Sequence, residues 1–112
     1  MLLFYHKELA AGRWHKMPLL EQLGNIGSEV SRVIRWRGRD RKLFWSAVER
    51  ALELFDLTLA DSRWRGRWRE IARAREIFLD AVLEDRQYKS SLEDLERYFF
   101  HFALAARRAS GS

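Results

Sequence analysis

The chain has 112 residues, of which 47% are hydrophobic and none is cysteine; this length predicts a single domain over residues 1–112, and the composition excludes wholesale disorder and a disulfide scaffold. The net charge is +5, and because only four of the 21 basic residues are lysine, arginine carries most of the positive charge. No apolar run approaches the roughly 20 residues that span a bilayer, and no secretory signal is evident, so we expect no membrane association and a cytoplasmic location.

The hydrophobic periodicity is helical along nearly the whole chain, which predicts an all-α fold. Residues 1–17 fit either a short helix ended by Gly12 or an arm across the body. A first long helix is expected from Pro18 to Trp36, because the fixed φ and missing N–H of proline suit a first helical turn. Its apolar face consists of Leu19, Leu23, Ile26, Val30 and Val33.

Two glycines, Gly24 and Gly27, lie inside this expected helix. Each costs up to about 1 kcal/mol relative to alanine in a helix interior. We therefore expect these two positions to allow a neighbouring helix to approach closely, at a tight crossing.

A second helix is expected from residue 40 to residue 61, with Asp40 as its N-cap. Apolar residues cover most of its circumference, which predicts a central position in the fold. One narrow stripe of this helix is acidic and requires a basic partner, either Arg32 or Arg35 or a residue of another subunit. The stripe consists of Glu49, Glu53 and Asp56.

A third helix is expected from residue 67 to residue 83, with Trp68 among its buried residues and Arg65, Arg69 and Arg73 facing outward. A capping box at Ser90 or Ser91 predicts the start of a fourth helix, which ends near Arg107 and leaves residues 108–112 as a flexible tail. This helix carries more apolar surface than one bundle interior takes up. The residues expected to face a partner or another subunit are Tyr98, Phe100 and Leu104.

Four helices joined by short turns predict an up-and-down four-helix bundle. The two basic turns, around Gly38 and Gly66, then lie at opposite ends of the second helix. A ring of subunits would gather one turn from every copy into a continuous positive band at each rim. The pattern therefore favours a ring-like homo-oligomer.

Most of the positive charge lies in two stretches that each contain the sequence RWRGR. Arginine holds phosphate in two hydrogen bonds and tryptophan stacks on bases, so this pattern fits nucleic-acid binding. The same pattern also fits solvated helix ends, and both interpretations stay open. The nucleic-acid-binding candidates are Arg35, Trp36, Arg37, Arg39, Arg41, Arg63, Trp64, Arg65, Arg67, Arg69 and Arg73.

No constellation for catalysis stands out in the sequence. The three histidines form no HExxH pair, and neither a GxSxG motif nor a phosphate-binding glycine loop is present, so we expect no catalytic residue, metal or cofactor. One pair offers an enzymatic alternative, because Arg97 and His101 lie one helical turn apart. This pair is similar to the Arg and His of small helical ribonucleases of the HEPN type, which space the two residues more widely.

The segment LEQLGNIGSEVSRVIRW at residues 20–36 is followed by FWSAVERALELFDLTL at residues 44–59. Together they resemble the four-helix-bundle family that includes the 23S ribosomal-RNA intervening-sequence proteins and the accessory variability determinant of diversity-generating retroelements. The sequence departs from the family motif at Gly27, Ser28 and Val30. The matching positions are Asn25, Ile26, Glu29, Arg32, Ala51, Leu52, Glu53 and Leu54.

The resemblance implies a small, basic, helical accessory protein that forms a homopentamer. It also implies association with a reverse transcriptase and its structured RNA, with the cDNA as a further candidate partner, and it carries over no catalytic residue. The arginine turns would then hold phosphates with little reading of base sequence. The alternative left open by the residues is an adaptor bundle that docks an acidic protein partner.

Overall fold

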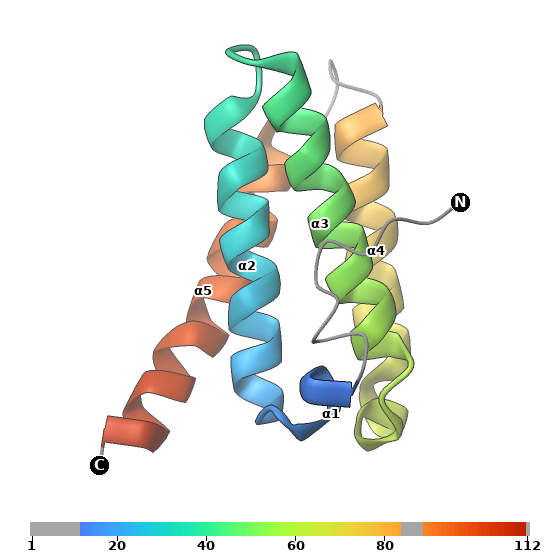
Figure 1. The fold of residues 1–112 in the computed structure, drawn as a ribbon, viewed down its shortest axis with the longest axis vertical. Coiled ribbons are helices and arrows are strands. Elements are labelled where there is room, and N and C mark those ends of the chain that lie inside the picture. Colours follow the sequence, from blue (N-terminus) through green and yellow to red (C-terminus); the bar gives the residue numbers. More distant parts are fainter. Residues whose placement is uncertain (1–11, 84–88, 112) are drawn as a thin grey trace.

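The computed structural model describes residues 12–83 and 89–111, and within these ranges the regular elements are all helical (Figure 1). The predicted all-α fold is therefore confirmed for the described residues. Among them, no helix is long and apolar enough to cross a membrane. In chain order the elements are α1 (Trp14–Lys16), α2 (Leu19–Trp36), α3 (Arg41–Leu59), the 3₁₀ helix η2 (Ser62–Arg67), α4 (Trp68–Leu83) and α5 (Lys89–Gly111).

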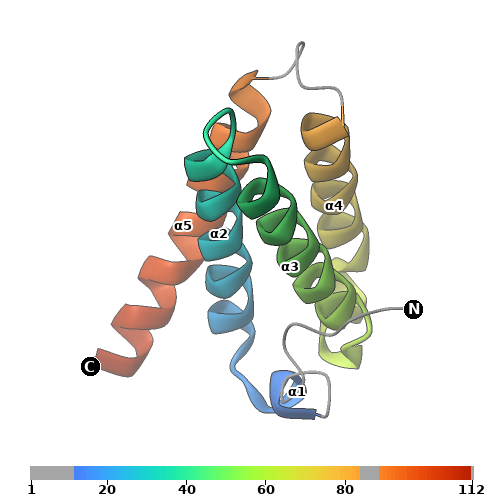
Figure 2. The same ribbon diagram turned by 45° about the horizontal axis from the view of Figure 1, so that its top comes forward.

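The four long helices alternate in direction, with α2 and α4 running one way and α3 and α5 the other (Figure 1). The α2–α3 turn lies at one end of the bundle, and η2 lies with α1 at the other end (Figures 1 and 2). The predicted placement of the two basic turns at opposite ends is thus confirmed. The 19 residues of α3 separate them by about 28 Å, at 1.5 Å per residue.

Local signals set the boundaries of α2 and α3. Pro18 stands directly before α2 as its N-cap, with φ of −56°. Asp40 has extended backbone angles, and its side chain accepts a hydrogen bond from the Leu43 N–H at 2.9 Å. This bond satisfies one of the N–H groups that the first turn of a helix leaves without a partner, so the predicted N-cap of α3 is confirmed.

The core is built around the apolar face of α2, as its periodicity predicts. Three phenylalanines from α3, α4 and α5 meet there, with ring centroids 5.7 Å apart for Phe55 and Phe78 and 5.8 Å apart for Phe55 and Phe99. The fully covered residues of α2 include Leu23, Ile26, Val30 and Val33.

The crossing of α2 and α5 is tight at the two glycines. A Cβ added at Gly27 would lie 2.6 Å from the Cβ of Phe99, and one added at Gly24 would lie 3.2 Å from the backbone of Ala103. Side chains do not tolerate the first distance, so α2 needs glycine at position 27 to pack against α5. The prediction of close approach is confirmed.

The last helix differs from its prediction. It continues to Gly111, so residues 108–111 extend the helix where a flexible tail was expected. The side chains of Ser90 and Ser91 lie outside the described residues, as do residues 1–11 of the N-terminal arm, and the capping box stays a prediction. Beyond Phe99, no described residue of α5 is fully buried, and this half of the helix diverges from the bundle (Figures 1 and 2).

Candidate nucleic-acid interface

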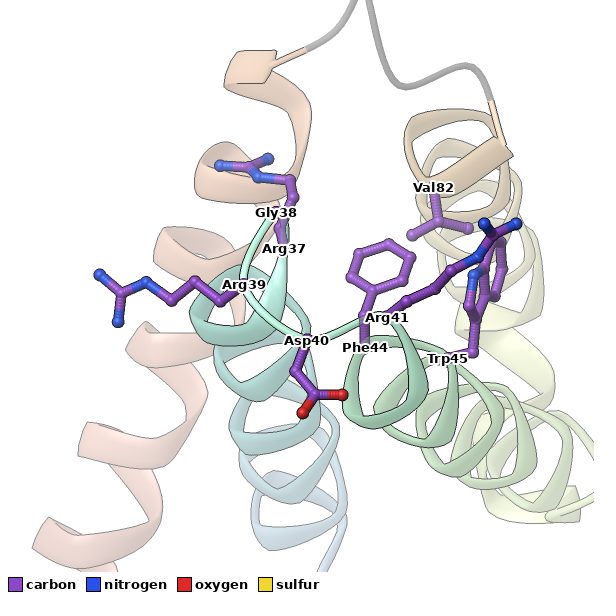
Figure 3. Close-up of a pocket in the computed structure, with 8 residues that line it drawn as sticks. All are labelled: Arg37, Gly38, Arg39, Asp40, Arg41, Phe44, Trp45 and Val82. Carbon is purple, nitrogen blue, oxygen red and sulfur yellow. The ribbon is translucent and has the colours of Figure 1, made fainter.

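The α2–α3 turn borders a cavity of about 440 Å³ at one end of the bundle (Figure 3). Gly38 has φ of +75°, a conformation that side chains disfavour, and it lets the chain reverse between α2 and α3. The turn therefore presents three arginines next to the aromatic first turn of α3. The lining residues are Arg37, Gly38, Arg39, Asp40, Arg41, Phe44, Trp45 and Val82.

Arg37 is already paired within the fold. Its Nη2 lies 2.5 Å from Oε2 of Glu93 on α5, and both side chains are partly buried. Burial raises the pKa of Glu93. The hydrogen bond from Arg37 and several smaller contributions lower it by more, so the pKa lies below its usual value. Arg37 thus ties α2 to α5, and its charge is largely neutralised at the turn.

Arg39 and Arg41 differ from Arg37, because both are exposed and neither has a carboxylate partner among the described residues. In Figure 3, Arg39 extends to the side opposite Arg41 and Trp45, which extend toward α4, where Val82 lies. We call Arg39, Arg41 and Trp45 the turn site. Arg35 is likewise exposed without a carboxylate partner in the described part of the chain, and Trp36 is partly buried.

Trp45 is a site residue that the sequence did not place among the nucleic-acid-binding candidates. Its side chain is 37% exposed, and its ring meets the ring of Phe44 edge to face at 5.0 Å. A ring held on one side by a neighbour and open on the other can stack on a base. The available signal was spacing, because Trp45 lies one helical turn after Arg41 on a helix whose apolar residues exceed what the core can cover.

The opposite end of the bundle corrects the prediction for Trp64. Its side chain is 2% exposed, and its indole Nε1 donates a hydrogen bond to Oε1 of Gln22 at 2.6 Å. The 3₁₀ geometry of η2 turns this indole into the core, so no base can stack on it. The exposed ring at this end is Trp68 instead, with 51% exposure where burial was expected.

Arg63 is also held within the fold. Its guanidinium donates hydrogen bonds to both carboxylate oxygens of Asp61, at 2.7 Å from Nη2 to Oδ2, and to the carbonyl of Met17 at 2.9 Å. The hydrogen bond from Arg63 holds the pKa of Asp61 far below its usual value. Burial acts in the opposite direction, and a hydrogen bond from Gln22 lowers the pKa further. Arg63 therefore stabilises the fold, and its Nε and Nη2 donors are engaged within it.

Two more predicted arginines have partners one turn along α4. Arg67 binds Glu70 at 2.8 Å, with its guanidinium 5.7 Å from the ring centroid of Trp64, and Arg73 binds Glu76 at 3.2 Å. At this end of the bundle, the candidate arginines that are exposed and keep no carboxylate partner within the described part are fewer than predicted. They are Arg65 and Arg69, which with Trp68 form what we call the corner site.

At Asp56, the acidic stripe of α3 has a different partner from the one expected. Asp56 accepts a hydrogen bond from Nε of Arg75 on α4 at 2.9 Å, whereas Arg32 pairs with Glu29 within α2 at 2.5 Å. Glu49 and Glu53 each make an interaction as well. The stripe therefore joins α3 to α4 at Asp56, because the bundle places α4 and not α2 beside this residue.

The residues of the predicted partner face of α5 differ in how far they are exposed. Tyr98 packs against the core, and its hydroxyl donates a hydrogen bond to Glu70 on α4, so it does not face outward. Burial and this bond raise the pKa of Tyr98 above its usual value. Phe100 is 53% exposed and Leu104 is partly buried.

The pair proposed for a ribonuclease lies on the same helix. Arg97 forms an ion pair with Asp94, and His101 is exposed. Among the described residues, no group of three or more acidic or histidine side chains could hold a metal ion.

The arrangement offers two separated basic sites, each with one exposed indole ring and two exposed guanidinium groups. Such a set can hold phosphates electrostatically and stack on a base, and it contains no paired acid and base for bond cleavage. In comparisons with protein-family models, curated proteins and solved structures, the chain matches none of them.

Proposed function

We propose that the protein is a non-catalytic accessory protein that binds the phosphate backbone of structured RNA, chiefly through the turn site. One observation carries the proposal: the turn site exposes Arg41 beside the half-open ring of Trp45 and Arg39 on the other side of the turn, with no carboxylate partner for either arginine in the described part of the chain. Asp40 lies between them, but its carboxylate caps α3. The corner site, about 28 Å away, is a second contact.

Ionic contact with phosphates depends steeply on salt and little on base sequence. Arginine also suits RNA because its flat guanidinium stacks on unpaired bases as well as binding phosphate. These properties support an accessory role in which the shape of the RNA, and a protein partner, supply the specificity. The resemblance of residues 20–59 extends the proposal to a reverse transcriptase of a diversity-generating retroelement as that partner.

The test is a titration of a labelled, structured RNA at several salt concentrations. In Arg39→Gln/Arg41→Gln, we expect the slope of log K against log salt to become shallower by about 1.5 to 2, because roughly one phosphate contact is lost with each arginine. The matched control is Arg73→Gln/Arg75→Gln. It also removes two positive charges, but from arginines that are already paired with Glu76 and Asp56, so it should leave the slope close to that of the wild type.

Equal slopes for the two double variants would mean that net charge alone attracts the RNA, and would contradict the turn site. An acidic protein added as competitor distinguishes the second candidate, an adaptor for an acidic partner. Displacement of the RNA by sub-stoichiometric amounts of polyglutamate would favour that adaptor. Binding of a purified reverse transcriptase with and without its template RNA then tests the extended proposal.

A further inference from the structure

A groove runs between α2 and α5 on a face away from both basic sites. Two adjoining cavities of about 490 Å³ and 310 Å³ make up the groove, and they share Gly24, Ser28, Ala103 and Arg107 in their linings. The floor is small and largely apolar because α2 presents Gly24 and Gly27 where α5 crosses it. The charged residues of the lining are Glu21, Glu96, Arg97 and Arg107.

The α5 wall of this groove carries the second most exposed large hydrophobic side chain of the described residues. Phe100 is 53% exposed, although it lies directly after the fully buried Phe99. From Phe102 to Ala106 the described side chains are only partly covered. A half-covered apolar stretch on an otherwise charged helix is typical of an interaction surface.

The charges along this wall of α5 are complementary to those of a second, antiparallel α5. Glu96, Phe100, Ala103 and Arg107 all line the same cavity, and their spacing of four, three and four residues keeps them on one face of α5. If a second α5 lies antiparallel with a two-fold axis between Phe100 and Ala103, each Phe100 meets the other copy's Ala103. In the same register, each Glu96 meets Arg107 of the other copy.

We propose that this groove is the interface of a homodimer, in which the α5 helices of two copies pack antiparallel. Phe100 of each copy enters the groove of the other, where the cavity of about 490 Å³ beside Ala103 leaves room for its ring. Glu96 and Arg107 of opposite copies pair at both edges. The order of residues fits a second copy of the chain as the occupant. A two-fold contact requires a self-complementary surface, and here the acidic end of one α5 lies opposite the basic end of the other.

The contact is small. The stripe from Glu96 to Arg107 is about 16 Å long, so the buried surface falls in the class of weak, reversible interfaces. A two-fold pair also differs from the five-fold ring that the family resemblance implies, in which unlike surfaces meet. The inference does not depend on RNA binding, since the turn site and the corner site lie outside the groove.

Sedimentation velocity over a range of about 5 to 500 μM protein tests the homodimer, with the Kd obtained from the concentration dependence. We expect a monomer–dimer equilibrium for the wild type. Glu96→Arg and Arg107→Glu should each raise the Kd by about tenfold or more, because each places like charges opposite one another at both edges. The double variant Glu96→Arg/Arg107→Glu should return the Kd to within about threefold of the wild type.

Restoration in the double variant can arise only between copies, because the two residues lie about 16 Å apart along their own helix and cannot pair within it. Thermal melting by circular dichroism checks each fold, since Glu96 also accepts a hydrogen bond from Ser31 at 2.6 Å. Phe100→Gln supplies an independent variant, because its exposed ring can be changed without opening the core. It should abolish the dimer.

Three results would overturn the proposal. The first is a wild-type protein that stays monomeric over the whole range. The second is an assembly of any size that the charge variants and Phe100→Gln leave unchanged, which would place the contact elsewhere. The third is a double charge variant that remains as weak as the single variants although its melting temperature is that of the wild type.

Discussion

Gln22 donates a hydrogen bond from Nε2 to Oδ2 of Asp61 at 3.0 Å, across 39 residues of sequence, and both side chains are buried. The same amide donates to the carbonyl of Trp14 at 2.6 Å and accepts from the indole of Trp64 at 2.6 Å. One glutamine thus joins α1, α2 and η2. The arrangement fixes the end of the bundle that carries the corner site.

Gln22→Leu should lower the free energy of unfolding by about 3 kcal/mol. The replacement keeps a similar volume but leaves the buried indole N–H of Trp64 without its acceptor, which costs about 1 to 3 kcal/mol. It also removes the hydrogen bonds from Gln22 to Asp61 and to the Trp14 carbonyl, although that carbonyl keeps the one from the Met17 N–H. Urea denaturation followed by circular dichroism measures the effect. Ser28→Ala is the control, since Ser28 is exposed and bonds only within its own helix. A change below about 0.5 kcal/mol in Gln22→Leu would contradict the role of this amide.

Asp61→Asn should destabilise the protein by about 2 kcal/mol at pH 7, because it weakens the hydrogen bonds that the buried carboxylate accepts from Arg63 and Gln22. The pKa of Asp61 is lowered in the folded protein, mainly by the hydrogen bond from Arg63. Its stabilising contribution is therefore fully present above the unfolded pKa of about 3.9 and is lost as the pH falls below that value.

The difference in unfolding free energy between wild type and Asp61→Asn should accordingly shrink between pH 5 and pH 2. Urea denaturation at a series of pH values gives this difference directly. Comparing the two proteins cancels the acid dependence that comes from other carboxylates, such as Glu70 and Glu93, whose pKa values are also lowered. A difference that is constant with pH would mean that the charge of Asp61 is unimportant.

Alanine substitutions of Trp64 and Trp68 separate effects on stability from effects on RNA binding. Trp64→Ala should cost about 4 kcal/mol of stability, because it empties a buried site and removes the hydrogen bond to Gln22. Trp68→Ala should cost less than about 1 kcal/mol but weaken RNA binding about tenfold, the effect of losing one base stacked on an aromatic ring. Thermal melting and RNA titration measure the two effects. Unchanged RNA affinity in Trp68→Ala would confine binding to the turn site.

Gly27→Ala should lower the melting temperature, although alanine is the better helix former. Its Cβ would lie 2.6 Å from that of Phe99, and the forced shift of α5 costs more than the gain of about 1 kcal/mol in helix propensity. We expect a net loss of about 2 kcal/mol in urea denaturation. Gly66→Ala is the control, because a Cβ there meets nothing within 4 Å. Equal stability of the two variants would show that the crossing can widen at little cost.

The long helices were predictable from the sequence because their signals are local. The repeat of apolar residues gave α2 its buried face, and Asp40 marked the start of α3 through a side chain that bonds three residues ahead. The tight crossing at Gly27 was also predictable, because glycine destabilises a helix interior and its presence there indicates close packing. What the glycine could not reveal was its partner, Phe99.

The errors arose where local pattern and tertiary contact disagree. Trp64 and Trp68 occupy similar sequence surroundings, yet a 3₁₀ turn changes the angular spacing between them and buries only the first. Arg37 looked as available as Arg39 until Glu93, 56 residues later, was brought beside it. Positive charge could be located from the sequence, but whether it is already neutralised depends on which helices are neighbours.

The contact between Gly27 and Phe99 also bears on how the protein is made. The two residues are about 70 positions apart, so at 5 to 20 residues per second the ribosome adds the second roughly 4 to 14 s after the first. Throughout that interval the apolar face of α2 lacks the helix that covers it most closely. The nascent chain therefore passes through a state in which the surface of α2 around Gly24 and Gly27 is open to chaperones or to other chains, and this crossing closes only after synthesis has reached α5.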